Sequence, residues 1–144
     1  MHTESKSVLL VSMPFAGIDI PSIQLGVLES YLRERDVDIQ TVHLYLNAAE
    51  IYGLRNYAQL IYPPNDSYTA QMIFSKYVFP EHYEKNQEKL KEYFSKTHQG
   101  FTFEEYSNKT DLFYNWFFEN INWQDFDIIG FTSVSYTHLR AHET

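Results

Sequence analysis

Two continuous apolar runs constrain the fold of this chain more than any other feature. Residues 7–13 (SVLLVSM) and residues 126–134 (FDIIGFTSV) consist mainly of large apolar and β-branched side chains. Runs of this kind are typical of parallel strands that are buried on both faces of a sheet. The sequence therefore predicts an α/β fold in which both runs belong to one parallel sheet.

The first 46 residues predict a strand, a helix and a second strand. The first run ends at Pro14, and Ser22 stands where the N-cap of a helix belongs. Residues 37–46 alternate in polarity, which favours a second and more peripheral strand. The crossover of such a βαβ unit is nearly always right-handed. The expected apolar stripe of the helix consists of Leu25, Leu28 and Leu32, joined by Val27 and Tyr31.

A long helical insertion, residues 47–122, is predicted between the second and third strands. Residues 47–62 read as one helix despite Gly53, ended by two prolines. A short helical piece and a mostly solvated helix are expected within residues 68–100, and an aromatic helix is expected over residues 111–121 with Asp111 near its start. The first strand is expected to lie between the other two, because the second strand has the more peripheral pattern.

The last residues of the chain, 134–144 (VSYTHLRAHET), look like a translated sequencing adapter of the transposon-end type. The alternative is a natural polar C-terminus. With the adapter interpretation, the protein proper spans residues 1–133 and is the front end of a longer gene. His138 and His142 have the i,i+4 spacing of two metal ligands on a helix, but their place in this tail argues against a metal site.

Composition excludes several classes of protein. The net charge is −8, and the 11 lysines and arginines are scattered, which argues against a nucleic-acid partner. No apolar run approaches the roughly 20 residues that span a bilayer, and the first residues do not resemble a signal peptide. We therefore expect no membrane partner and a cytoplasmic location. The absence of cysteine excludes disulfides, thiolate metal sites and iron–sulfur clusters from this sequence.

The most promising ligand site lies at the carboxyl ends of the strands, where open α/β sheets bind their ligands. It comprises the loop of residues 13–22 together with Thr132 and Ser133. The loop has neither a GxGxxG fingerprint nor a GK[ST] phosphate loop. Its many apolar residues favour a flat organic ligand or a partner domain. The alternative is an ordinary connection packed under its own helix.

No catalytic constellation is visible. There is no GxSxG, and Ser12, Ser22 and Ser133 lack an identifiable histidine base. We interpret His43 as a half-buried structural residue of the second strand. We interpret the aromatic helix as part of the core and not as a cofactor site. The chain is therefore not expected to be catalytic by itself.

Several segments together resemble a known family. They are SMP at the end of the first strand, PSIQLG at the start of the first helix, LN after the second strand, YG in the next helix, FSKYVF in the insertion and DIIGFTS in the third strand. With these segments the chain resembles the N-terminal cobalamin (B12)-binding domain of radical SAM enzymes. Within this family it is most similar to the enzymes that mature ribosomally made peptides.

This resemblance implies a partial flavodoxin-like (Rossmann-like) parallel sheet of three strands that holds cobalamin across its carboxyl ends. It also implies a missing barrel domain with a CxxxCxxC iron–sulfur site. In the parent enzyme that barrel would cleave S-adenosylmethionine, and methylcobalamin would often donate a methyl group to carbon in a precursor peptide. A complete domain of this kind has about five strands, so the third strand is expected to be an uncovered edge.

The chain departs from the cobalamin-binding pattern in one respect. It has no DxHxxG motif, so a histidine ligand to cobalt is not supported. Two rival functions remain open: a protein or peptide interaction module that uses the aromatic insertion, and a stand-alone flavodoxin-like nucleotide binder. The implied cobalamin-facing residues are Ser12, Met13, Pro14 and Phe15 after the first strand, Pro21, Ser22 and Gln24 at the helix start, and Thr132 and Ser133 after the third strand.

Overall fold

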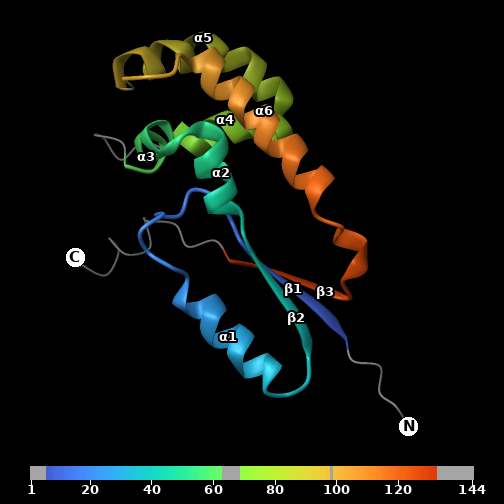
Figure 1. Ribbon diagram of the computed structural model, residues 1–144. Coiled ribbons are helices and arrows are strands. Elements are labelled where there is room, and N and C mark those ends of the chain that lie inside the picture. The colour runs from blue at the N-terminus through green and yellow to red at the C-terminus, as the bar shows by residue number, and fades with distance from the viewer. Residues whose placement is uncertain (1–5, 63–68, 98, 133–144) are drawn as a thin grey trace, which may run out of the picture. The chain divides into compact units, whose positions relative to one another are not determined.

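The computed structural model describes residues 6–62, 69–97 and 99–132 (Figure 1). Site residue Ser133, the adapter-like tail with its two histidines, and the two prolines at 63 and 64 lie outside these residues. The chain divides into two compact units, each described below by itself. One unit is built from the chain up to Asn47 and from Phe117 onward, and the other is Ala48–Trp116.

The first unit contains the predicted sheet. Its strands are β1 (Ser7–Ser12), β2 (Asp38–His43) and β3 (Ile128–Thr132), and all are parallel, with the order β2-β1-β3. The fold class is thereby confirmed: the chain is an α/β protein with a three-stranded parallel sheet, consistent with a partial Rossmann-like fold. The central place of β1 is also as predicted.

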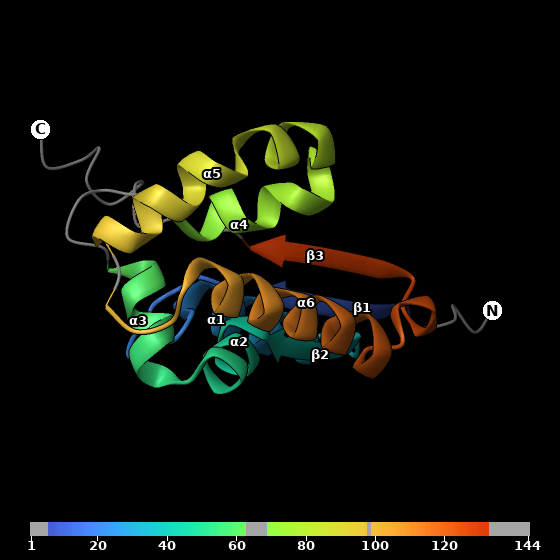
Figure 2. The same ribbon diagram turned by 90° about the horizontal axis from the view of Figure 1, so that it is seen from above.

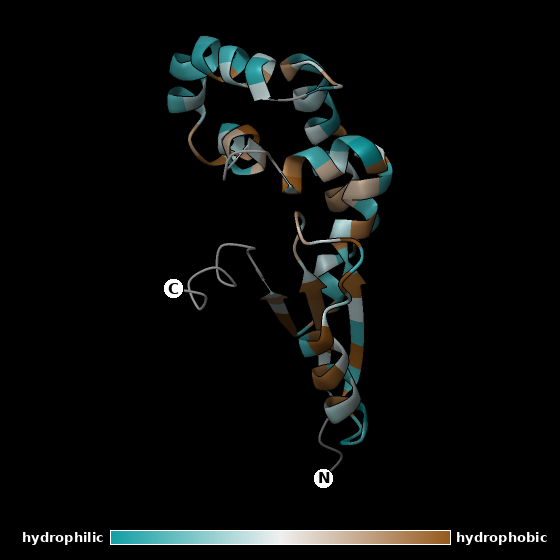
Figure 3. Cartoon of the chain, turned by 90° about the vertical axis from the view of Figure 1, so that its left-hand side faces the viewer, coloured by the Kyte–Doolittle hydropathy of each residue, from teal (hydrophilic) through white to brown (hydrophobic). Residues whose placement is uncertain are grey.

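One face of this sheet is covered by α1 (Ile23–Arg33). Leu25 of the helix packs with Val8, Leu10 and Ile39, and Leu32 and Val37 border this cluster. The Ser22 side chain accepts a hydrogen bond from the Leu25 N–H, as an N-cap does. Figure 3 shows brown, apolar colour over the strands that α1 covers.

The buried stripe of α1 is narrower than the sequence predicted. Leu25 and Leu32 face the sheet, but Leu28, Val27 and Tyr31 are exposed. A helix that lies on a small sheet buries only the side chains at its line of contact. Glu29 also lies on this contact side of α1, since its carboxylate accepts a hydrogen bond of 2.8 Å from the Thr41 hydroxyl of β2.

On the opposite face, Leu9 and Val11 of β1 are buried. A short 3-10 helix, η1 (Trp123–Asp125), places Trp123 against Phe131 of β3, with ring centroids 6.2 Å apart.

At the amino ends of β1 and β3, the Asp127 carboxylate accepts hydrogen bonds from the Ser7 N–H and hydroxyl, which lowers the pKa of Asp127.

The run that forms β3 has the composition of a strand buried on both faces, but β3 lies at an exposed edge of the sheet. Among the described residues β3 pairs only with β1, and Phe131 remains 57% exposed. Ile128 is exposed as well. An apolar strand at an edge is the arrangement that the sequence predicted for a sheet without its remaining strands.

The second strand and the helix after it have other boundaries than predicted. The second strand ends at His43 rather than at Leu46, because its alternating polarity ends there and α2 (Leu44–Tyr52) begins. The single helix expected over residues 47–62 is divided at Gly53, whose φ of 79° is incompatible with a right-handed helix. Beyond it lies α3 (Leu54–Ile61).

The rest of the insertion is helical, as predicted, with α4 (Thr69–Val78), α5 (Pro80–Thr97) and α6 (Phe103–Asn120). The prediction that the last helix begins near Asp111 is wrong. Thr102 and Glu105 form a capping box, in which the Glu105 N–H donates to the Thr102 hydroxyl and the Thr102 N–H donates to the Glu105 carboxylate. None of the described helices has the length and apolar character needed to cross a membrane.

Buried tyrosines form the centre of this second unit. Tyr106 has no exposed surface and packs against Tyr52 and Phe94. Its hydroxyl donates to the Asn56 carbonyl, and burial raises the pKa of Tyr106 to about 12. The Tyr52 hydroxyl is hydrogen-bonded to Thr110, and burial raises the pKa of Tyr52 as well.

An ion pair between a largely buried lysine and a half-exposed aspartate joins α4 to α6. The Lys76 ammonium lies 2.6 Å from the Asp111 carboxylate and also donates to the Ser107 carbonyl and hydroxyl. The Tyr77 hydroxyl donates to the same carboxylate, and its ring stacks on Tyr114 at 3.9 Å. Asp111 therefore holds α4 from the middle of α6 and does not cap the start of that helix.

We expect Gly100→Ala to destabilise the second unit by about 1–3 kcal/mol, because Gly100 has a φ of 145°, a conformation that is essentially restricted to glycine. A Cβ atom there would also lie 2.6 Å from the Asn56 side-chain oxygen. Gly26→Ala is the matched control: Gly26 lies within α1 with open space around it, so alanine should stabilise by about 0.5–1 kcal/mol. Urea denaturation measures both changes. Equal stability of the two variants would contradict this account.

Candidate functional site

The carboxyl end of the sheet brings some of the predicted site residues together. Ser12 is in register with Thr132 of β3, and the Met13 N–H donates to the Thr132 carbonyl at 3.0 Å. The loop of residues 13–22 then leads to the capped start of α1 at Ser22. Ser12, Met13 and Thr132 are therefore neighbours, while Gln24 is exposed on α1.

The backbone of the loop is strained at Phe15. Its φ is 71°, in the left-handed region, which is rare for bulky residues. Asp36, in the turn after α1, is the other described non-glycine residue with positive φ, and aspartate tolerates this conformation better. Strained backbone tends to cluster at functional sites. Phe15 therefore marks the loop as a candidate ligand site.

The loop presents an apolar surface. Ile20 is 58% exposed and Ile23, in the first turn of α1, is 74% exposed. Pro21 between them is also exposed, and Met13, Pro14 and Phe15 are half-buried. Contiguous exposed apolar side chains often mark binding surfaces. This supports a contact surface at the loop over an ordinary, self-packed connection.

The positive charges of this unit lie at its other end. Its described lysines and arginines are Lys6, Arg33 and Arg35. Lys6 precedes β1, and the two arginines follow at the end of α1, so all three lie toward the amino ends of the strands. The described carboxyl end of this unit therefore has no lysine or arginine, so it would bind a phosphate only through neutral donors such as backbone N–H groups and hydroxyls.

The sequence favours His43 as a half-buried structural residue of the second strand, and the structure also places it at this end of the sheet. It ends β2 in register with Ser12, and its Nδ1 atom is shielded from solvent without a hydrogen-bond partner among the described residues. Its ring lies edge-on to Tyr45, with centroids 5.6 Å apart. Only the register of the sheet reveals its place beside Ser12. In the described part of the chain, no three acidic or histidine side chains are grouped to hold a metal ion.

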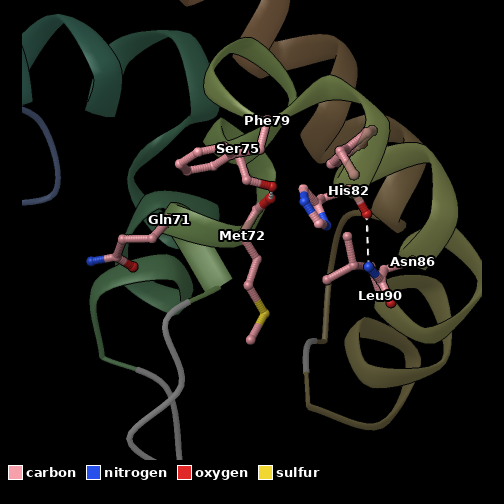
Figure 4. A pocket seen from close by; sticks show the side chains of 8 residues that line it. Gln71, Met72, Ser75, Phe79, His82, Asn86 and Leu90 are labelled. Carbon is pink, nitrogen blue, oxygen red and sulfur yellow. Dashed lines mark hydrogen bonds between the residues drawn. The ribbon is translucent and has the colours of Figure 1, made fainter.

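A second concave surface lies in the other unit, between α4 and α5. The two helices run side by side (Figure 2) and border a groove of about 540 Å³. Figure 4 shows that side chains from both helices, including Met72, His82 and Leu90, point into the space between them. The lining contains no Asp, Glu, Lys or Arg; it consists of Gln71, Met72, Ser75, Phe79, His82, Tyr83, Asn86 and Leu90.

Fold and site together define an α/β protein with a parallel sheet and a candidate ligand surface at the carboxyl ends of its strands. No protein family, curated protein or solved structure matches the chain. Its function must therefore be inferred from its own residues and from the resemblance of its sequence segments described above.

Proposed function

We propose that this chain is the cobalamin-binding part of a cytoplasmic radical SAM enzyme that modifies ribosomally made peptides by C-methylation. The chain binds the cofactor and is not catalytic by itself. The observation that carries the proposal is the strained, apolar loop of residues 13–22 at the carboxyl end of the parallel sheet. The sequence resemblance adds the identity of the ligand.

The chemistry of the loop suits a corrin ring. A corrin offers a broad face with little charge, and the apolar side chains of Pro14, Phe15 and Pro21 would contact such a face. Neutral hydroxyls at Ser12 and Thr132 lie beside them. The rival nucleotide ligand is disfavoured because the loop has neither a GxGxxG fingerprint nor a GK[ST] phosphate loop.

Within the proposed enzyme, this chain's residues bind and orient the cofactor. Bound cobalamin supplies a transferable methyl group, while the iron–sulfur cluster and S-adenosylmethionine belong to the barrel domain. No histidine of this chain would ligate the cobalt, because the chain has no DxHxxG motif. The exposed apolar edge of β3 is where the remaining strands of the domain would pair.

Equilibrium dialysis tests the proposal, with hydroxocobalamin, FMN and ATP as separate ligands and corrinoid or nucleotide absorbance as the readout. We expect saturable binding of hydroxocobalamin and no saturable binding of FMN or ATP. If FMN or ATP binds and hydroxocobalamin does not, the rival nucleotide function is correct. If none of the three binds, the proposal is also wrong.

A second candidate function, peptide docking, is favoured by the groove between α4 and α5. The facing residues are spaced as stripes along two helices, with Met72, Phe79, Tyr83 and Leu90 providing apolar contacts. Since no charged side chain lines the groove, its best occupant is the apolar face of an amphipathic peptide helix. With this function, Met72→Glu would abolish binding of such a peptide and leave hydroxocobalamin binding unchanged.

A further inference from the structure

A row of three polar side chains crosses the carboxyl end of the sheet. Parallel pairing aligns Ser12 with His43 on one side and with Thr132 on the other. Residues in register on neighbouring strands project from the same face. Because Ser12 alternates with Leu10 and Val8, this is the face that α1 covers. The row therefore lies at the carboxyl end of the covered face, where the loop of residues 13–22 leads into that helix.

Both outer members of the row have an unsatisfied polar atom. His43 Nδ1 and Thr132 Oγ1 are shielded from solvent and have no hydrogen-bond partner in the described part of the chain. Ser12, between them, is buried. Buried polar groups are almost always hydrogen-bonded, because an unpaired one destabilises the fold. Two such atoms in one row at a candidate ligand site indicate that a ligand supplies the missing partners.

The geometry of the row limits the chemistry of that ligand. Neighbouring strands lie about 4.8 Å apart, so the row spans about 10 Å. A ligand that satisfies both ends therefore has several neutral polar groups along one edge. A hydroxyl can donate and accept, and a neutral imidazole nitrogen does one or the other. A primary carboxamide offers both a donor and an acceptor to such partners.

We propose that Ser12, His43 and Thr132 form a polar row that hydrogen-bonds the primary carboxamides at the edge of the corrin ring. This inference rests on the proposed cobalamin function and adds His43 to the site. The row would set the position of the ring, while the apolar loop contacts its face. His43 is a binding residue in this proposal and does not ligate cobalt.

The test compares binding and stability in the full chain. Thr132→Val and His43→Leu should each weaken hydroxocobalamin binding by about 3- to 10-fold, since each removes one hydrogen bond. Without ligand, however, the melting temperature of Thr132→Val should be unchanged or higher, because valine removes an unpaired buried hydroxyl. Thr69→Val is the matched control: the Thr69 hydroxyl is also buried and has no hydrogen-bond partner among the described residues, but it lies on α4, so hydroxocobalamin binding should not change.

Cobinamide identifies the part of the cofactor that the row recognises, because it keeps the corrin carboxamides and lacks the nucleotide tail. Both variants should weaken cobinamide and hydroxocobalamin equally. An effect on hydroxocobalamin alone would assign the row to the tail and overturn the inference. Unchanged binding by both variants would also overturn it while leaving the cobalamin function intact. A Thr132→Val variant that melts lower would show that the hydroxyl is structural, contrary to this inference.

Discussion

A chain that carries both Phe15→Asp and Pro21→Asp is expected to bind hydroxocobalamin about 100-fold more weakly than the wild type, or not measurably. Each substitution places a carboxylate on the apolar loop surface, where it would lose water on contact with the corrin face. Desolvation of an unpaired charge costs about 3 kcal/mol or more, which corresponds to about 100-fold in affinity. Corrinoid absorbance after equilibrium dialysis measures the loss.

A chain that carries both Leu54→Asp and Leu112→Asp is the matched control for this experiment. Both leucines are exposed apolar residues of the helical insertion, and their replacement adds the same two charges outside the loop. Binding by this variant should equal that of the wild type. If the double variant retained full affinity, the corrinoid would bind elsewhere, and the site assigned to residues 13–22 would be wrong.

The largest loss of stability is expected from Tyr106→Ala, at about 3–5 kcal/mol. The ring of Tyr106 is fully buried among Tyr52, Phe94 and Phe101, so its removal leaves a cavity in the second unit. Tyr106→Phe keeps the ring and removes only the hydrogen bond to the Asn56 carbonyl, at a cost of about 0.5–1.5 kcal/mol. Urea denaturation followed by circular dichroism separates the two variants. Similar losses for both would mean that the hydrogen bond, and not the packed ring, stabilises this unit.

The sheet was predictable from sequence because its signal is local. Continuous apolar runs identify β1 and β3, and alternation identifies β2, so strand order and direction followed from pattern alone. The exposure of β3 on its outer side depends on what lies beside it, which its own residues do not encode. The run FDIIGFTSV has the composition of a buried strand, whether or not a neighbour covers it.

Helix boundaries were predicted less well because weak local signals competed. The apolar pattern around Gly53 favours one continuous helix, but the positive φ of Gly53 ends α2, and α3 begins after it. The capping box of Thr102 and Glu105 is a readable start signal. The dense aromatic pattern farther along instead indicates a start near Asp111, and the capping box decides where α6 begins.

The candidate site was predicted only in part. The loop of residues 13–22 and Thr132 followed from the rule that ligands bind at the carboxyl ends of parallel strands. Two features needed the structure: the strained backbone of Phe15, and the register that sets His43 beside Ser12. Neither a φ value nor a cross-strand register is encoded by the local residues in a form that sequence patterns reveal.

Hydrogen–deuterium exchange with and without hydroxocobalamin tests the central claim most directly, because it locates the bound corrinoid on the chain. The account predicts slower exchange in peptides that cover the loop of residues 13–22 and the end of β3, and unchanged exchange in peptides of α4 and α5. Slower exchange confined to α4 and α5, or no change anywhere at saturating ligand, would contradict a cobalamin site at the carboxyl end of the sheet.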